Sequence, residues 1–329
     1  MNIVYSASDL YSSLAGISIL SLLENNKQAA EINIYIMDNG ISNANKEKLY
    51  SMVHGYERNL VFFPLSEKLT EANINIQRWN ISTFGRLFEA SSLPEHVKKV
   101  IHIDCDTVID GSIEPLWELD LSNAVVAGAL ECLSDKYKIN IGMKPEDSYI
   151  NAGNIVINLE RIRELKLEEK FLEYIQSHSK LLTYVDQEVL NACVPECEKV
   201  VFPLKFNAYS ILYFLNYKQL KKLRRVNRMF SIKEYEEAKK EAVIIHYTTC
   251  FLDGSRPWIE GNQHPRRDTF LKYKVMSPWS DMPLWKDNRN SKQRIISTVV
   301  HIMPKVILVP LVSLIHGVIV PLRNKQLQD

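Results

Sequence analysis

The chain has little glycine and cysteine and almost no net charge. Its 329 residues include 11 glycines, 13 prolines and five cysteines, and 40 basic side chains are balanced by 39 acidic ones, for a formal net charge of +1. Such a composition excludes a collagen-like or wholly disordered chain. The balanced charge excludes a global field that would attract nucleic acid. With 46% hydrophobic residues, the sequence predicts a sizeable core in one enlarged domain or two.

The cysteines are scattered, and none forms a CxxC pair. Cys193 and Cys197 are spaced as CxxxC, but packed thiols are favoured over metal ligands because no second pair completes a tetrahedral site. An odd, unpaired set in a chain of this size indicates a reducing compartment. The first residues, MNIVYSASDLYSS, have no basic stretch followed by a long apolar one. We therefore expect no signal peptide.

Short apolar runs alternate with helical patterns along most of the chain. Strands are expected at 2–6, 31–37, 59–64, 100–103, 124–130, 155–159 and 243–247, and helices at 14–23, 43–52, 160–178 and 186–192. This order is typical of an α/β fold in which helices cover a largely parallel sheet. Functional groups in such folds gather at the ends of strands.

Two carboxylates follow one of the expected strands. Asp104 and Asp106 come directly after the apolar run 101–103. On extended backbone, residues i and i+2 project to the same side. Converging carboxylate oxygens suit a hard divalent cation such as Mn²⁺ or Mg²⁺. Such a triplet is also common in solvated turns, so the interpretation depends on the motifs around it.

Four further motifs accompany this pair in a fixed order. They are TFGRLF at 83–88, INAGN at 150–154, DQ at 186–187, and IHY at 245–247 with RPW at 256–258. Taken together, the set resembles glycosyltransferase family 8, the retaining sugar-nucleotide transferases, over roughly residues 2–280. The resemblance implies a GT-A domain at 1–280, which is a Rossmann-like nucleotide-sugar-binding α/β fold with a mostly parallel central sheet.

The resemblance also implies roles for single residues. Asp104, Asp106 and His246 match the family's metal ligands for Mn²⁺ (or Mg²⁺), although a histidine on an apolar strand is usually structural. Asp186 and Gln187 match an acceptor-facing and sugar-facing catalytic pair, with a helix N-cap and a polar first-turn residue as the alternative. Residues 151–153 match a loop beside the sugar. The implied donor-binding positions are Ala7, Asp9, Tyr11, Arg86, Asp104, Cys105, Asn151, Ala152, Gly153 and Arg256.

The implied reaction moves galactose or glucose from a UDP-sugar to a glycan or glycolipid acceptor in lipopolysaccharide, capsule or another surface glycan. Retention through a covalent intermediate needs a carboxylate nucleophile. Because Gln187 is an amide, same-face attack by the acceptor is favoured, with Arg86 and Arg256 helping to absorb the charge of the leaving diphosphate. A nucleotide-sugar hydrolase and a catalytically impaired, membrane-bound scaffold remain alternatives.

The sequence departs from the family pattern in places. The family's A-D-D-N-Y is here ASDLY at 7–11, so Ala7, Asp9 and Tyr11 remain as candidates for uridine contact. The loop after His246 is longer than usual, and Arg256 replaces a lysine. Glu131 stands where the family often has an aspartate near the acceptor.

Two segments match no family motif. Residues 218–230 carry lysines and arginines but no acid, which fits a solvated helix face or a surface that contacts anionic lipid or substrate. Within the segment 281–329, residues 306–322 are uncharged and would form a helix about 26 Å long, against a hydrocarbon core of about 30 Å.

Prolines 304, 310 and 321 interrupt this apolar run, and basic residues flank it. A bent helix that associates with the anionic membrane surface is therefore expected for 281–329, with a single span or a docked soluble helix as alternatives. The protein is accordingly expected in the bacterial cytoplasm, peripheral on the inner face of the cytoplasmic membrane.

Overall fold

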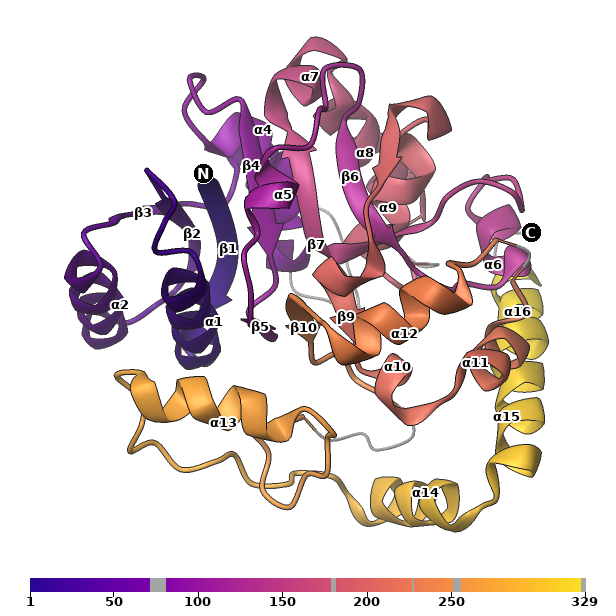
Figure 1. Cartoon of the computed structure of the whole chain (residues 1–329). Coiled ribbons are helices and arrows are strands. Elements are labelled where there is room, and N and C mark those ends of the chain that lie inside the picture. Colours follow the sequence, from indigo (N-terminus) through magenta and orange to yellow (C-terminus); the bar gives the residue numbers. More distant parts are fainter. Residues whose placement is uncertain (72–80, 179–181, 227, 251–255, 327–329) are drawn as a thin grey trace.

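The computed structural model describes residues 1–71, 81–178, 182–226, 228–250 and 256–326. Its centre is a seven-stranded sheet of order β3-β2-β1-β4-β7-β6-β8, and a three-stranded sheet of order β5-β10-β9 lies beside it (Figure 1). The strands of the large sheet are β1 (Asn2–Ser8), β2 (Asn33–Asn39), β3 (Asn59–Phe63), β4 (Lys99–Ile103), β6 (Val126–Leu130), β7 (Ile150–Asn158) and β8 (Lys199–Val201). Those of the small sheet are β5 (Thr107–Ile109), β9 (Ala208–Tyr209) and β10 (Ile244–His246).

Helices cover the large sheet and extend beyond it. In the first half they are α1 (Ser12–Asn25), α2 (Asn43–Gly55), α3 (Glu67–Glu71), α4 (Glu89–Ser92), α5 (Glu114–Trp117), α6 (Asp135–Asn140), α7 (Leu159–Glu164) and α8 (Leu167–His178). They continue as α9 (Asp186–Cys193), α10 (Ile211–Phe214), α11 (Tyr217–Arg224), α12 (Ile232–Lys240), α13 (Arg267–Met276), α14 (Ser291–Ile302), α15 (Lys305–Leu314) and α16 (Val320–Gln326). Short 3₁₀ helices occupy Ile81–Phe88, Glu196–Glu198 and Leu204–Asn207.

Most neighbouring strands of the large sheet run parallel. β1 pairs in parallel with β2 and β4, β2 with β3, and β6 with β8. Ile3, Val4 and Tyr5 of β1 are fully buried, because both faces of a parallel sheet are covered. The expected α/β fold with a mostly parallel sheet is therefore confirmed.

Strand β7 is the exception, and it brings two site motifs together. It runs antiparallel to both β4 and β6, with Ile103 opposite Asn154. The start of β7 consequently lies beside the end of β4. Residues 151–153, expected in a loop, are the beginning of this strand.

Helix α1 fixes the position of the small sheet. It is buried along almost its whole length, and its small polar side chains make specific contacts with β5. The hydroxyls of Ser18 and Thr107 lie 2.9 Å apart, and Ser21 Oγ accepts a hydrogen bond from the Ile109 backbone N–H at 2.9 Å. These bonds hold the strand that follows Asp106.

The helix expected at 160–178 is two helices. Lys166, with φ of 49°, separates α7 from α8. A non-glycine residue in the left-handed region interrupts the helical hydrogen-bond ladder. The apolar pattern continues across the break, which explains why periodicity alone predicted one element.

The C-terminal segment bends at Pro304 and packs on the rest of the chain. α15 lies along α11 (Figure 1), where Leu308 and Val309 are 2% exposed. Arg225 Nε donates to Ser313 Oγ at 2.7 Å, and Ser313 Oγ donates to the Lys222 carbonyl at 2.8 Å. One side of the tail is therefore docked.

The other side of the tail remains apolar and exposed. Ile302 and Val306 are 75% and 78% exposed. A π-helical turn at Ile315–Ile319 joins α15 to α16, and the resulting helix Lys305–Arg323 is, by length and composition, long and apolar enough to cross a membrane. Contact of this side with a membrane stays a prediction, as does the division of the chain near residue 280.

Candidate active site

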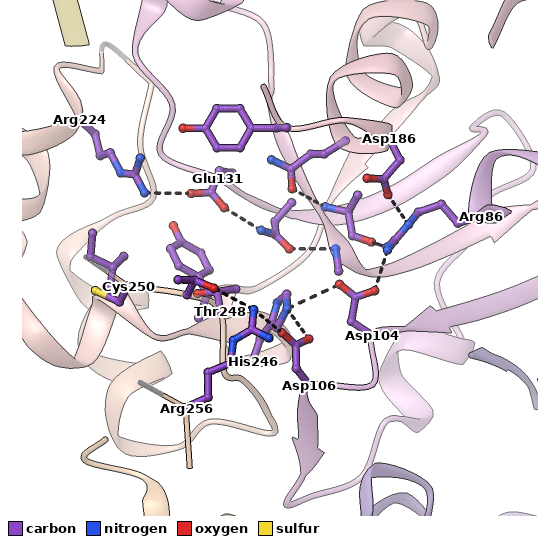
Figure 2. A pocket seen from close by; sticks show the side chains of 18 residues that line it. Arg86, Asp104, Asp106, Glu131, Asp186, Arg224, His246, Thr248, Cys250 and Arg256 are labelled. Atoms are coloured by element: carbon purple, nitrogen blue, oxygen red, sulfur yellow. Dashed lines mark hydrogen bonds and ion pairs between the residues drawn. The ribbon is translucent and has the colours of Figure 1, made fainter. Parts of the chain in front are cut away.

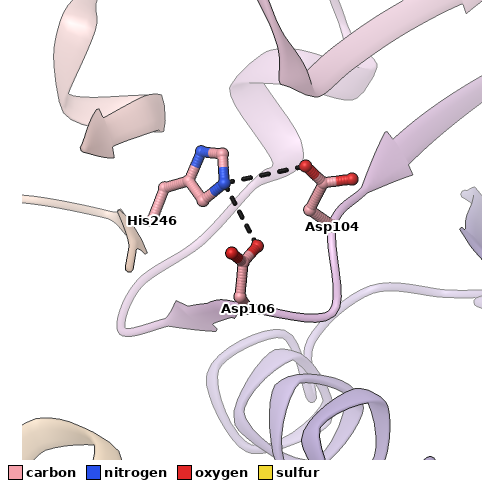
Figure 3. A group of neighbouring side chains, drawn as sticks. All are labelled: Asp104, Asp106 and His246. Carbon is pink, nitrogen blue, oxygen red and sulfur yellow. Dashed lines mark ion pairs between the residues drawn. The ribbon is translucent and has the colours of Figure 1, made fainter. Parts of the chain in front are cut away.

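Three potential metal ligands converge between the two sheets. Asp104 and Asp106 flank the turn from β4 to β5, and His246 ends β10 opposite Thr107 of β5. His246 Nε2 lies 3.6 Å from Asp104 Oδ2 and 3.1 Å from Asp106 Oδ1 (Figure 3). The three ligand atoms lie within 4.8 Å of one another. Two carboxylate oxygens and one imidazole nitrogen form a donor set that fits a divalent cation.

The first strand residues of β7 leave room for this cluster. A Cβ atom on Gly153 would lie 2.1 Å from His246 Cε1 and 2.8 Å from Asp104 Oδ2. Both distances are shorter than van der Waals contact, so only glycine permits the observed approach. Glycine is therefore required at position 153 because there is no room for a side chain. Its backbone conformation, which is that of an ordinary strand, does not require glycine.

A buried asparagine orients the imidazole. Asn207 Oδ1 lies 3.0 Å from His246 Nδ1 and also accepts from Asn154 Nδ2 at 3.0 Å, while Asn207 Nδ2 donates to Asn151 Oδ1 at 2.8 Å. Because an amide oxygen only accepts, Nδ1 of His246 carries the proton. In the neutral imidazole, the lone pair of Nε2 therefore faces the two carboxylates, as a metal-ligating histidine requires.

Arg86 joins three elements around the cluster. Its Nη2 lies 2.6 Å from Asp104 Oδ1, its Nε pairs with Asp186 Oδ2, and its Nη1 donates to the carbonyl of Ala152 (Figure 2). Burial alone would lower the pKa of Arg86, but the carboxylates of Asp104 and Asp186 outweigh it and raise that pKa. The guanidinium stays charged and fixes the end of β4 against β7 and α9.

The charged side chains around the cluster shift one another's pKa values. Burial alone would raise the pKa of Asp104, but the Arg86 guanidinium outweighs it and holds that pKa well below its usual range. For Asp186 burial prevails and raises the pKa. Burial would lower the pKa of His246, but Asp106 outweighs it and raises that pKa. The cluster is therefore rich in negative charge, which favours a cation.

Two cavities meet at Arg86 and Asp104. The first, of about 360 Å³, contains the three potential ligands together with Gln187 and Arg256 (Figure 2). The second, of about 370 Å³, is lined by Ser6, Ser8, Tyr11 and Asn39 at the ends of β1 and β2. Arg86 and Asp104 line both cavities, so the two cavities adjoin at these two side chains.

The expected sugar-side residues line the first cavity, where their polar groups also bind one another. Gln187 Oε1 accepts from the Ala152 N–H at 2.9 Å, and Gln187 Nε2 donates to Tyr149 Oη at 3.3 Å. Asn151 Nδ2 donates to Glu131 Oε2 at 2.7 Å, and Asn151 Oδ1 accepts from Gly153 N–H at 2.9 Å. These amides are rigidly placed, and their roles toward a substrate stay predictions.

The backbone is strained immediately before the catalytic candidates Asp186 and Gln187. Val185 precedes Asp186 with φ of 52° and ψ of −117°, a conformation that β-branched residues rarely adopt. Such strain, about 1–3 kcal/mol, concentrates at functional sites. Asp186 itself is only 7% exposed and lines the first cavity next to Gln187.

The residues expected to contact the nucleotide differ in whether they line the second cavity. Tyr11 lines the second cavity, and its ring meets Trp285 edge-on at 5.8 Å. Ala7 is buried in the core, and Asp9 accepts from Ser42 N–H at 2.8 Å. Cys105 donates its thiol to the Ser6 carbonyl at 3.1 Å. The side chains of Ala7, Asp9 and Cys105 are thus engaged within the protein, and their donor-binding roles stay predictions.

Arg256 and the basic segment supply further cations. Arg256 Nη2 lies 3.5 Å from Asp106 Oδ2 and donates to Thr249 Oγ1 at 2.8 Å. Arg224, at the end of α11, reaches the first cavity and lies 3.7 Å from Glu131. The run 218–230 is therefore neither wholly solvated nor wholly a lipid surface, because α11 buries Leu220 and Leu223.

Sequence reasoning missed several residues of the site, of which four with polar side chains stand out. They are Tyr184, Asn207, Tyr209 and Arg224. Arg224 lay within the basic run, whose charge was the available signal. Asn207 lies in a segment, LKFNAY at 204–209, without any pattern that marks a functional group.

Comparisons with known proteins identify the family of this chain. The family described as Glycosyl transferase family 8 matches residues 2–260. General stress protein A of Bacillus subtilis is 26% identical over 287 residues, covering 85% of this chain and 95% of that protein. Lipopolysaccharide 1,2-glucosyltransferase of Escherichia coli is 26% identical over 300 residues, covering 87% of this chain and 81% of that protein.

A solved structure shows the same fold. The galactosyltransferase LgtC, crystallised with donor and acceptor sugar analogs, superimposes with a TM-score of 0.67 at 21% identity, covering 90% of this chain and all of that one. The expected GT-A fold and the expected family are both confirmed. The chain is an enzyme that belongs to glycosyl transferase family 8.

Proposed function

We propose that this enzyme transfers a hexose, galactose or glucose, from a UDP-sugar to a saccharide acceptor during the synthesis of lipopolysaccharide, capsule or another surface glycan. One observation carries the proposal. The cluster of Asp104, Asp106 and His246 lines the first cavity, and its Asp104 also lines the second. A nucleotide-sugar has a nucleoside and a sugar on either side of a diphosphate, and this arrangement fits that shape. The names of two matched relatives include lipopolysaccharide glucosyl- and galactosyltransferase.

The second cavity suits the nucleoside. Its hydroxyl and amide side chains are able to bind the ribose and the edges of the base, and Tyr11 offers an aromatic ring for stacking. The motif at 7–11 differs from the family pattern, and its Ser8 lines this cavity. The sugar then lies in the first cavity, against β7 and Gln187.

The cluster fits a divalent cation, Mn²⁺ or Mg²⁺. The candidate ligands are Asp104, Asp106 and His246, and the protonated Nδ1 of His246 leaves Nε2 free to bind. The imidazole favours Mn²⁺, because Mg²⁺ prefers oxygen ligands alone. When bound, a cation held by these residues would supply positive charge to the diphosphate. Arg86 and Arg256 hold positive charge on either side of that position.

The groups beside the sugar bear on how the enzyme would retain the configuration of the anomeric carbon. Gln187 presents an amide, which is a poor nucleophile, and its oxygen already accepts from Ala152 N–H. Asp186 is held by Arg86. Attack by the acceptor hydroxyl on the face that the diphosphate leaves therefore explains retention better than a covalent intermediate would. Gln187 stabilises positive charge at the anomeric carbon.

The tail supports a place on the inner face of the cytoplasmic membrane. Its exposed apolar side chains include Ile295, Ile302 and Val306, and Lys292 and Arg294 lie in the same region of α14. Apolar and basic groups together bind anionic lipid surfaces. A membrane-bound enzyme would meet a lipid-linked acceptor there.

The test is release of UDP by the purified full-length chain. We expect UDP-glucose or UDP-galactose to be consumed when Mn²⁺ is added, faster with a membrane extract as acceptor, and not in the presence of EDTA. Consumption of neither donor would contradict the proposal and favour a scaffold. Rapid UDP release that no extract accelerates would favour a nucleotide-sugar hydrolase.

A further inference from the structure

The second cavity follows one edge of the large sheet across three strands. β4, β1 and β2 are neighbours in that order (Figure 1). The chain at or just beyond their ends contributes Asp104, then Ser6 and Ser8, then Asn39 to the cavity. Neighbouring strands are about 4.8 Å apart, so the end of β2 lies about 10 Å across the sheet from that of β4. A ribose joins the base of a nucleotide to its phosphates. With the diphosphate beside Asp104, the base is therefore the part that reaches β2.

The amide of Asn39 is half-buried and fixed on two sides. Its Nδ2 donates to Ser6 Oγ at 2.9 Å. Gly40 follows with φ of 85°, and Asp38 Oδ1 accepts from the backbone N–H groups of Gly40 and Ile41 at 3.0 and 2.7 Å. The chain thus turns directly after Asn39, and this turn and the bond to Ser6 together determine where the amide lies.

The amide oxygen of Asn39 is left for a ligand. Within the described residues, Asn39 Oδ1 accepts no hydrogen bond from the protein, because the bond to Ser6 uses Nδ2. An amide oxygen only accepts, so it selects a ligand atom that donates. Ser6 and Ser8, on the neighbouring strand, present hydroxyls, which rotate and either donate or accept. At the ends of β1 and β2, Asn39 Oδ1 is therefore the group that distinguishes a donor from an acceptor.

The acid closest in sequence to these serines makes a different contact. Asp9 Oδ1 accepts from the Ser42 backbone N–H and from Asn45 Nδ2, both at 2.8 Å. These bonds tie the loop after β1 to the start of α2. Among the described residues that line the second cavity, the one carboxylate is Asp104, at the diphosphate end. The acceptor that remains for the base is the neutral amide of Asn39.

We propose that Asn39 recognises the nucleobase of the donor, with its Oδ1 accepting a hydrogen bond from N3–H of uracil. The proposal rests on the proposed transfer from a UDP-sugar. In uridine, N3–H is the single hydrogen-bond donor of the base, while O2 and O4 only accept. The hydroxyls of Ser6 and Ser8 are able to donate to these carbonyl oxygens. Asn39 belongs to none of the sequence motifs, so base recognition would depend on a residue outside them.

The test is calorimetric titration of the full-length chain, in the presence of Mn²⁺, with UDP and with UDP methylated at N3. The methyl group removes the one donor of the base, so we expect the unmodified chain to bind UDP at least about tenfold more tightly than the methylated form. Asn39→Ala removes the acceptor and should bind the two ligands within about twofold of each other. Asn39→Asp keeps an acceptor oxygen and should still prefer UDP. Asn43→Ala, at an exposed asparagine of α2, is the matched control and should keep the full preference.

Equal binding of the two ligands by the unmodified chain would overturn the proposal, and this comparison needs no variant. An undiminished preference for UDP in Asn39→Ala, or loss of the preference in Asn39→Asp, would overturn it as well. Consumption of UDP-glucose and UDP-galactose by the unmodified chain is measured in parallel. If UDP does not bind and neither donor is consumed, the proposed function fails. If UDP binds and a donor is consumed but methylation at N3 has no effect, only the role of Asn39 fails.

Discussion

Asn207 accepts a hydrogen bond of 3.0 Å from Nδ1 of His246, and so determines which imidazole nitrogen faces Asp104 and Asp106. The bond is fully buried, since Asn207 is 0% exposed and His246 is 4% exposed. The candidate cation site therefore depends on Asn207 as well as on the neighbouring Asp104 and Asp106 and the distant His246. This relationship leads to the first prediction.

Asn207→Leu should weaken Mn²⁺ binding about 10- to 100-fold, because the imidazole loses the partner that orients it. Asn207→Asp keeps an acceptor oxygen at the same place and should bind Mn²⁺ within a few-fold of the unmodified chain. Titration followed by electron paramagnetic resonance measures both variants. Equal affinities for Asn207→Leu and the unmodified chain would show that His246 needs no such support.

Gly153→Ala should abolish Mn²⁺-dependent UDP release, because its new methyl group would overlap His246 and Asp104. Gly55→Ala is the matched control, since no atom lies within 4 Å of the added Cβ there. Circular dichroism checks that both variants fold. An active Gly153→Ala enzyme would mean that the cluster is not arranged as described.

Asp104→Asn should lower turnover by at least about a hundredfold, because one charge is lost at the position of the leaving diphosphate. The exposed Asp120→Asn serves as control and should leave turnover unchanged. Melting curves of the two variants are compared to exclude unfolding. Full activity of Asp104→Asn would refute the assignment of Asp104 as a metal ligand.

Glu188 should make stability depend on pH. Burial raises its pKa from 4.5 to about 7, so the folded state holds this proton more tightly than the unfolded state does. The stability from this group is present below about pH 4.5 and is lost as the pH rises through about 7. Glu188→Gln should therefore be more stable than the unmodified chain at pH 8 and differ little from it at pH 4.5.

The size of the Glu188 effect is of the order of 3 kcal/mol at pH 8, from about 1.4 kcal/mol per unit of pKa. Urea unfolding at the two pH values measures it. Glu169→Gln, at an exposed position on α8, is the control and should change stability little at either pH. A Glu188→Gln variant that is less stable at pH 8 would show that Glu188 is ionised in the folded state.

The two sides of the tail should respond differently to substitution. Replacing the exposed Ile302 and Val306 by aspartate should reduce binding to anionic vesicles at least about tenfold, through lost apolar burial and added repulsion. The melting temperature should not change. Leu308→Ala, on the docked side, should instead lower stability by about 2–5 kcal/mol. Vesicle sedimentation and thermal melting separate the two effects.

The sequence predicted seven of the ten described strands, and several of the residues that line the candidate site, for a physical reason. Buried parallel strands such as β1 and β4 are short apolar runs, and Asp104 and Asp106 follow one of them directly. His246 was found through the order of motifs and not through its local pattern. The place of this histidine in the order of motifs identified it, because hydrophobic periodicity does not distinguish a metal ligand from a structural histidine.

The features that the sequence left hidden depend on contacts between distant elements. β5 and β9 are three and two residues long, too short for a periodic signal. Asn207 is an ordinary buried amide until β10 brings His246 beside it. The docking of α15 on α11 depends on one face of an apolar helix, and composition alone does not distinguish that from a membrane face.

The reversed direction of β7 has a consequence for how donor preference could evolve. Its first residues, 151–153, line the cavity in which we propose that the sugar binds, and they lie between the pairing of Ile150 with β6 and the pairing of β7 with β4 from Asn154 onward. Insertions or deletions there would shift one of these pairings relative to the other. Discrimination between epimeric hexoses should therefore diverge through other parts of the cavity, such as positions 248–250, while residues 151–153 stay constant among descendants of this enzyme.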